Sequence, residues 1–282
     1  MAFSSTNMNR HFDLETVEKT IRPFPATATK IMALCNSQES RPTEIAELIE
    51  CEPAVAVKLL AMANSPLFAT TRAVTNIHQA IVMLGYRSVS QMALTIAAGP
   101  LFTSGDPALL QHRTSLFRQS LGVATVSRLF AEQISKCDPS EAFLGGMMLD
   151  VGKLFFFDMV PEHYVSILNE NKAGDTATIE SEKFGMDHPT IGNQCAKSWG
   201  LPDQIGHLIQ NHHASENEDS DGLMQSVLAG IYFAQKMNIG FATEDEHIKN
   251  DDIESLIINL NEEELSEVAI EQYKSIESIF FS

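Results

Sequence analysis

Histidine and carboxylate side chains form the most informative pattern in this sequence, and they lie in its second half. Asp150 and Lys153 are three residues apart within an apolar stretch, His188 follows a Gly-x-Asp turn, and His212 and His213 are adjacent. Carboxylate oxygens and neutral imidazoles are the donors that zinc and similar divalent ions use in proteins. The same residues could also form a buried cluster in which each polar group satisfies another.

Several longer motifs occur in order along both halves of the chain. They are Leu48-Ile49-Glu50-Cys51-Glu52-Pro53-Ala54, Leu60-Ala61-Met62-Ala63-Asn64-Ser65, Ala80-Ile81-Val82-Met83-Leu84-Gly85, Leu149-Asp150-Val151-Gly152-Lys153, His188, Trp199-Gly200-Leu201-Pro202 and His212-His213. This series resembles the HDOD family, the HD-related output domains of bacterial signalling proteins. The resemblance covers roughly residues 20–215, and the ordered motifs make it more specific than any single short pattern.

The resemblance implies a helical scaffold related to that of the HD phosphohydrolases. Those enzymes hold one or two metal ions with a first histidine, a His-Asp doublet, later histidines and a final aspartate. The metal ions activate water and neutralise phosphate charge. At the matching positions this chain has Gln119 for the first histidine, Leu149 for the doublet histidine and Gly230 for the final aspartate. Asp150 alone remains of the four core ligands.

These departures weaken the metal site on chemical grounds. A catalytic metal site needs about three protein ligands and an open position for water. Leucine has no lone pair, glycine has no side chain, and glutamine is a weak neutral ligand. His112 lies seven residues before Gln119, about 10 Å away along a helix, and is too distant to replace the missing ligand. We therefore predict no catalytic residues, no bound metal and no cofactor.

The remaining positions that match the family's site are expected to be structural. His188 and one of His212 and His213 match the outer histidines of the family. Adjacent residues on a helix point about 100° apart, so we predict that His212 and His213 cannot both face one cavity. One should be buried and hydrogen-bonded, and the other exposed. For Asp150 we favour a buried carboxylate that caps a helix end or pairs with Lys153 or with a histidine over a metal ligand. Lys153 itself is expected to be solvated or salt-bridged.

Helical periodicity punctuated by proline and glycine predicts an all-α fold of two packed helical lobes. The break at 99–107 divides an N-terminal lobe (12–104) from an HD-like lobe (105–240), and an acidic helical tail (241–282) should pack on the body. Helices are expected over 25–36, 43–50, 54–63, 76–84, 88–98, 109–134, 140–157, 189–199, 202–213 and 223–237, with another opening at Pro161 and two tail segments at 253–260 and 265–269.

The chain is strongly acidic, with a net charge of −18. Residues 214–282 contain 16 acidic and 3 basic side chains, so the charge is concentrated in the last quarter. This disfavours general binding to nucleic acid. No apolar run approaches the roughly 20 residues of a membrane helix. Four scattered cysteines and the lack of an apolar leader favour a cytoplasmic protein with reduced thiols, and the resemblance to the HDOD family implies a bacterial one.

Two functions follow from these observations. The first is a non-catalytic regulatory module of signal transduction that binds a signalling partner protein or a small ligand, with neither nucleic acid nor membrane as partner. The alternative is a metal-dependent phosphohydrolase of the HD superfamily that acts on a nucleotide or phosphoester. That enzyme would need a divalent metal site rebuilt from Asp150, His188, His212 or His213, with Gln119 as a further ligand.

Overall fold

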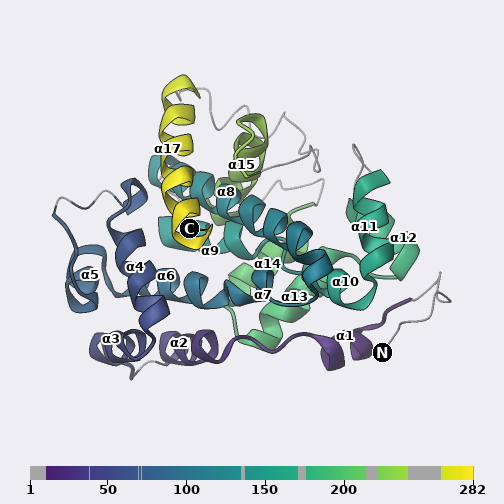
Figure 1. The fold of residues 1–282 in the computed structure, drawn as a ribbon, viewed down its shortest axis with the longest axis horizontal. Coiled ribbons are helices and arrows are strands. Elements are labelled where there is room, and N and C mark those ends of the chain that lie inside the picture. The colour runs from purple at the N-terminus through teal and green to yellow at the C-terminus, as the bar shows by residue number, and fades with distance from the viewer. Residues whose placement is uncertain are drawn as a thin grey trace.

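The computed structural model of the protein describes residues 11–37, 39–68, 70, 72–134, 137–170, 176–213, 222–240 and 262–281, and all regular structure in these ranges is helical. The predicted all-α class of two packed lobes is therefore confirmed. Figure 1 shows helices α2 to α5 at one side of the molecule and α10 to α13 at the other, with α8 crossing between them. None of the described helices combines the length and hydropathy needed to cross a bilayer.

Short helices make up the first half of the fold. They are α1 (Leu14–Thr20), α2 (Ala26–Asn36), α3 (Pro42–Glu50), α4 (Pro53–Ala63), η1 (Pro66–Phe68), α5 (Ile77–Leu84), α6 (Tyr86–Ala98) and α7 (Pro100–Thr103). Two of the expected helices begin with a proline, Pro42 in α3 and Pro53 in α4. Asn76 caps α5, because its side chain accepts from the backbone N–H of Gln79 at 2.8 Å.

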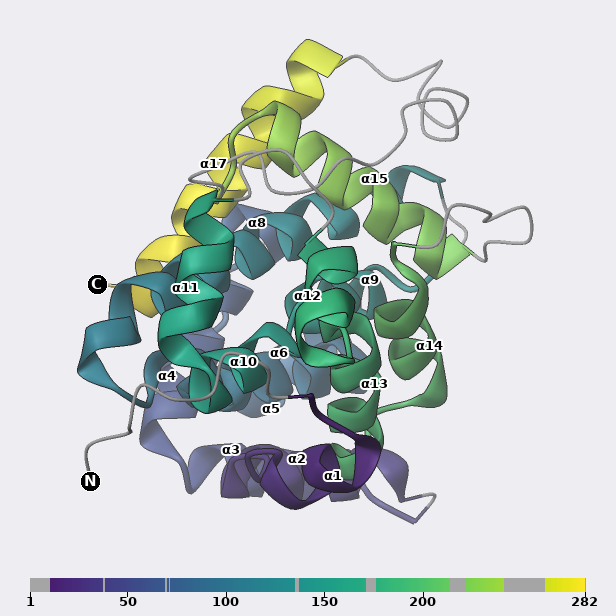
Figure 2. The same cartoon turned by 90° about the vertical axis from the view of Figure 1, so that its right-hand side faces the viewer.

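The second half is built around one long central helix, α8. Its helices are η2 (Pro107–Leu109), α8 (Leu110–Ile134), α9 (Pro139–Met148), α10 (Lys153–Met159), α11 (Pro161–Glu170), α12 (Thr176–Phe184), α13 (His188–Trp199), α14 (Asp203–Asn211) and α15 (Gly222–Lys236). α8 packs against both α9 and α15, and α6 packs against α9 to join the two lobes. The view of Figure 2 shows α12, α13 and α14 grouped together beside α9.

One predicted helix is wrong in a way that shapes the site. The single helix expected over 140–157 is divided into α9 and α10 by a turn at 149–152. The cause is a close approach of two helices at Gly152. A Cβ atom on Gly152 would lie 2.0 Å from the carbonyl oxygen of His188 and 2.8 Å from the backbone nitrogen of Gly192. The turn therefore seats the start of α10 directly on α13.

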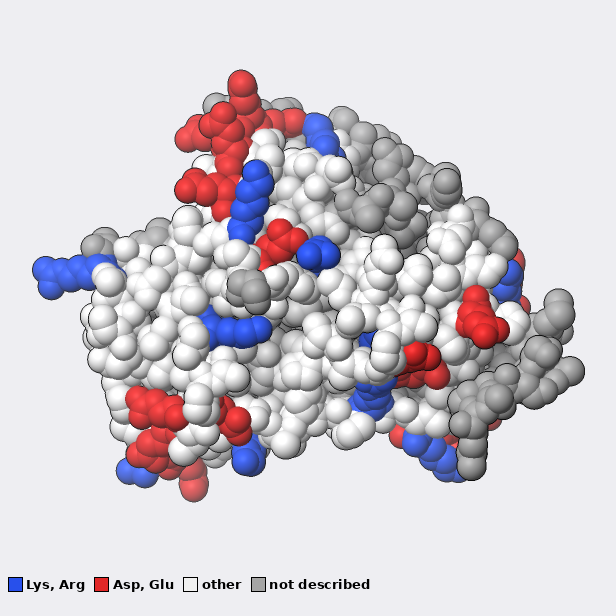
Figure 3. All heavy atoms as spheres, viewed as in Figure 1, with Lys and Arg blue, Asp and Glu red and all other residues white. Residues whose placement is uncertain are grey.

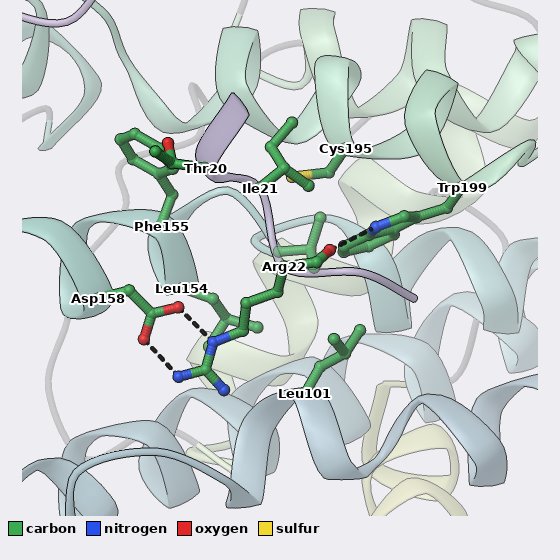
Figure 4. A pocket seen from close by; sticks show the side chains of 10 residues that line it. Thr20, Ile21, Arg22, Leu101, Leu154, Phe155, Asp158, Cys195 and Trp199 are labelled. Carbon is green, nitrogen blue, oxygen red and sulfur yellow. Dashed lines mark hydrogen bonds and ion pairs between the residues drawn. The ribbon is translucent and has the colours of Figure 1, made fainter. Parts of the chain in front are cut away.

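The segment before α2 was not expected to be helical, and it docks on the second half of the fold. α1 packs against α13, and Trp199 of α13 donates its indole N–H to the carbonyl of Arg22 at 3.0 Å. The Arg22 guanidinium forms a two-bond ion pair with Asp158 of α10 (Figure 4). The cavity among these residues measures about 20 Å³, which is room for about one water molecule. The predicted boundary between lobes stays a prediction.

Helix α17 (Glu262–Phe281) closes the described part of the chain and lies across both halves. It packs on α8, α4 and η1. Phe281 stacks edge-on against Phe117 of α8 at 5.3 Å, and Arg118 forms an ion pair with Glu277 at 2.8 Å. Its first turn carries exposed acidic residues, which gather at one end of the surface in Figure 3. The other predicted tail segment, 253–260, lies outside the described residues.

Candidate functional site

The five residues that the sequence singled out lie together in the second half of the fold. Asp150 comes from the turn between α9 and α10, Lys153 opens α10, His188 opens α13, and His212 and His213 follow α14. Asp150 Oδ1 lies 3.0 Å from Lys153 Nζ, 3.2 Å from His188 Nε2 and 3.9 Å from His212 Nε2. His213 Nε2 lies 3.2 Å from His188 Nε2. We call these five residues the histidine cluster.

The predicted partners of Asp150 are confirmed, and the prediction for the histidine pair is wrong. α14 ends at Asn211, so His212 and His213 lie in a turn and do not diverge as helix neighbours would. Their ring centroids are 4.2 Å apart, and both rings contact the ring of His188. His212 is buried, as expected for one member of the pair, but His213 is half-buried and faces the same site.

A buried carboxylate that sequence reasoning missed supports the cluster from behind. Glu180 of α12 has no solvent exposure. Its Oε2 accepts from the His188 ring Nδ1 at 2.6 Å and from the His188 backbone N–H at 2.7 Å. Its Oε1 accepts from the hydroxyl of Tyr164 at 2.6 Å. These bonds fix the His188 ring with Nδ1 toward Glu180 and Nε2 toward Asp150. No spacing in the sequence distinguishes Glu180 from the solvated glutamates around it.

The electrostatics of the cluster follow from this arrangement. Burial alone lowers the pKa of His188, but the Glu180 carboxylate and the hydrogen bonds to Asp150 and Glu180 outweigh it and raise the pKa to about 9. Burial raises the pKa of Asp150, yet Lys153 and His188 hold it well below its ordinary value. At neutral pH the Asp150 carboxylate therefore faces the protonated ring of His188.

The structure also tests whether the HD catalytic metal pattern fits. At the position of the final aspartate, Gly230 of α15 is pressed against α8. A Cβ atom there would lie 2.1 Å from Ser127 Oγ and 2.9 Å from the Ser127 backbone nitrogen. Leu149 is buried in the hydrophobic core, and Gln119 lies half-buried on α8. The residues at these three positions do not supply the family's catalytic ligand set.

Three imidazoles nevertheless meet in the histidine cluster. One ring nitrogen each from His188, His212 and His213 lies within 4.8 Å of the others. Lys153, which was expected to be solvated or salt-bridged, is buried and paired with Asp150. His112, by contrast, stacks on Phe157 of α10 at 6.2 Å. Three histidine nitrogens therefore meet in the cluster, and Asp150 Oδ1, the one core ligand that remains, lies close to two of them.

Comparisons with known proteins agree with the sequence motifs. The sequence model of the HDOD domain family matches residues 21–215. An uncharacterized protein of Treponema pallidum is 21% identical over 200 residues, which are 68% of this chain and 37% of that protein. The chain thus spans little more than a third of that relative's length.

Two solved structures have a similar fold. An HDOD domain protein of unknown function from Geobacter sulfurreducens has a TM-score of 0.69 and 24% identity, covering 94% of each chain. A candidate phosphohydrolase from Shewanella amazonensis has a TM-score of 0.70 and 19% identity, covering 93% of this chain and 97% of that one. At these identities the likeness shows the fold alone.

Proposed function

Because the chain belongs to the HDOD family, we propose that it is a non-catalytic regulatory module of signal transduction that acts by binding a partner protein or a small ligand. The proposal rests chiefly on the packing of Gly230. The backbone of α15 contacts α8 where the enzymes of the HD superfamily place their final aspartate, and Ser127 leaves no room there for a side chain. When helix packing fills the position of a catalytic ligand, the fold no longer supports the catalysis, but its surfaces remain available for binding.

A groove between α13 and α14, with apolar and polar walls, is the surface we favour for a small ligand. It encloses about 250 Å³, close to the lower range of small-molecule sites. Asn193, Lys197, Asp203 and His207 contribute donors and acceptors of both charge signs to its walls. Asn211 also lines the groove and directly precedes the histidine cluster. Ligand binding there could therefore be coupled to the turn that carries His212.

A metal-dependent phosphohydrolase is the second candidate. The observation that favours it is the convergence of three histidine nitrogens within 4.8 Å. Against it stand the three replaced catalytic positions and the Lys153 ammonium, which lies 3.0 Å from Asp150 Oδ1. An enzyme of this kind would need its water-activating ion held by Asp150 and the histidines, with one coordination position open.

A hydrolysis assay separates the two functions. The purified full chain is incubated with manganese and with mono- and diester nitrophenyl phosphates, alongside the Asp150→Ala variant. We expect no turnover above the variant. Turnover that requires both manganese and Asp150 would refute the non-catalytic proposal and establish the enzyme. Cytoplasmic location and the exclusion of nucleic acid and membranes as partners stay predictions of the sequence.

A further inference from the structure

We propose that the surface of α4, η1 and α8 on which α17 packs is a binding site for an acidic amphipathic helix of a partner protein. We call this surface the α17 groove. In the structure α17 itself occupies the groove, so the partner helix would have to displace it. The inference names the chemistry of the partner, and its role as a partner site rests on the proposed function of a binding module.

The α17 groove joins the two halves of the fold. α4 and η1 belong to the first half and α8 to the second, and α17 packs on all three (Figure 1). These three elements lie within residues 21–215, which the HDOD family model matches, whereas α17 lies outside that range. The groove is therefore part of the scaffold that the family model describes, and α17 covers it from outside the matched range.

The contact face of α17 is an apolar stripe that ends in two aromatic residues. Leu265 and Ile276 are buried and lie about three helical turns apart on one face. Phe280 and Phe281 both lie edge-on against Phe117 of α8, with ring centroids 5.1 and 5.3 Å away. Amphipathic helices bind hydrophobic grooves through anchors of this spacing. The surface beneath α17 therefore has the form of a helix-binding site.

Basic side chains around α17 favour an acidic occupant. Arg118 of α8 forms an ion pair with Glu277 at 2.8 Å, and Lys236 of α15 forms one with Glu262 at 2.5 Å. Lys58 of α4 lies 5.0 Å from the centroid of an aromatic ring at the C-terminal end of α17. A chain with a net charge of −18 thus places three basic side chains beside one groove. Their charge is complementary to that of an acidic helix.

One buried residue makes α17 an imperfect occupant of the groove. Gln272 lies on the contact stripe and is only 8% exposed, and its amide oxygen has no hydrogen-bond partner among the described residues. An unsatisfied buried oxygen weakens the packing of the helix that carries it. The ion pairs of Glu262 and Glu277 are partly exposed, so they add little. A partner helix with an apolar residue at this position would fit the groove better than α17 does.

A labelled peptide tests the groove in the full chain. The probe is a fluorescent peptide with the sequence of α17 that carries Gln272→Leu, and fluorescence anisotropy measures its binding. The same substitution in the chain strengthens the internal competitor, so it should weaken peptide binding about 5–100-fold. It should also slow hydrogen exchange of the α17 amides by a similar factor. These amides should exchange faster than those of α8, because α17 opens without global unfolding.

A pair of charge variants assigns the binding to the groove. Glu277→Lys in the chain places a like charge beside Arg118 and loosens α17, so the peptide should bind about 3–10-fold more tightly. The matched control is Glu271→Lys, which makes the same charge change on the exposed face of α17 and should leave peptide binding unchanged. Circular dichroism verifies that each variant is folded.

The outcomes separate this inference from the proposed function. The groove is refuted if the folded Glu277→Lys chain does not bind the peptide, if Gln272→Leu in the chain leaves binding unchanged, or if α17 exchanges only with global unfolding. A dimer that the peptide dissociates, seen by light scattering, would identify the α17 of a second copy as the occupant and overturn the partner assignment. Peptide binding without phosphoester turnover supports both proposals. Peptide binding together with turnover that requires manganese and Asp150 keeps the groove and refutes the non-catalytic function.

Discussion

The ion pairs of Asp158 join three distant parts of the chain, and their removal should destabilise the fold strongly. Asp158 accepts from Arg22, which precedes α2, and from Arg113 of α8 at 2.9 Å. The Arg113 side chain is only 1% exposed, and its other bond goes to the carbonyl of Leu101 at 2.6 Å. The substitution Asp158→Ala leaves this buried guanidinium without its counter-charge.

The expected cost follows from the unequal burial of the two pairs. Removing one partner of a buried ion pair costs about 3–5 kcal/mol. The pair with Arg22 is 30% and 23% exposed, so it contributes about 1 kcal/mol or less. Since Asp158 is itself partly exposed, we expect Asp158→Ala to lower the free energy of unfolding by about 3–4 kcal/mol. Arg22→Ala should cost about 1 kcal/mol.

Trp199 provides the assay, because it is the only tryptophan in the chain. Its ring stacks on Phe24 at 4.8 Å, and its N–H bonds to the Arg22 carbonyl. Its fluorescence therefore reports whether the segment before α2 is docked, while circular dichroism reports the helices. Urea titrations with both probes give the stability change and test whether undocking and unfolding coincide.

A second substitution tests the cause. Replacing a buried ion pair by apolar side chains is often neutral or stabilising. Arg113→Met added to Asp158→Ala should therefore recover most of the lost stability. If the double variant is as unstable as Asp158→Ala, or if Asp158→Ala costs no more than Arg22→Ala, the reasoning from the buried charge is refuted.

Three further predictions concern the cluster and the closed catalytic position. In metal-free protein the pKa of His188 is about 9 when folded, against 6.5 as its ordinary value. The raised pKa contributes about 3 kcal/mol to the free energy of unfolding below pH 6.5, and this contribution is lost as the pH rises through 9. Urea titrations at pH 6 and pH 10 should show this loss, and Glu180→Gln should reduce it; an equal loss in both proteins contradicts the assignment. Tyr164→Phe should cost about 1–3 kcal/mol by the same measurement, because Glu180 loses a buried donor, and a neutral result would refute that bond. Gly230→Asp should not create hydrolysis and should lower stability by about 1–3 kcal/mol, since its Cβ meets Ser127; an unchanged melting temperature would refute the close packing.

Local sequence signals predicted the helices well and their interruptions poorly. Pro42 and Pro53 mark helix starts because a proline fits the first turn without losing a hydrogen bond. The turn at 149–152 has no such signal, since Leu149 and Val151 are apolar residues within an apolar run. It is caused by the contact of Gly152 with the backbone of α13, which lies far away in the sequence. Spacing alone cannot reveal such a contact.

The sequence predicted which residues form the candidate site but not how they are arranged. Family motifs identified Asp150, His188 and the histidine pair, but the pair was placed on a continuous helix. The chain beyond His213 begins Ala-Ser-Glu, with neither proline nor glycine to indicate that α14 ends at Asn211. The sequence did not predict Glu180 as a site residue, because a glutamate within a charged helix resembles a solvated one. Only the packing of α12 shows that it is buried.

The chain has lost most of the catalytic ligands of the HD pattern but keeps a buried polar pair beside them. Gln119, Leu149 and Gly230 replace the catalytic ligands, and at Gly230 helix packing fills the space. A protein that needed only this packing would gain stability from an apolar core, because buried charges are costly even when paired. Yet Glu180 and His188 are fully buried and tightly bonded to each other. Their bonds fix the His188 ring with Nε2 toward Asp150, so the fold keeps an ordered polar cluster where most of the catalytic ligands are replaced.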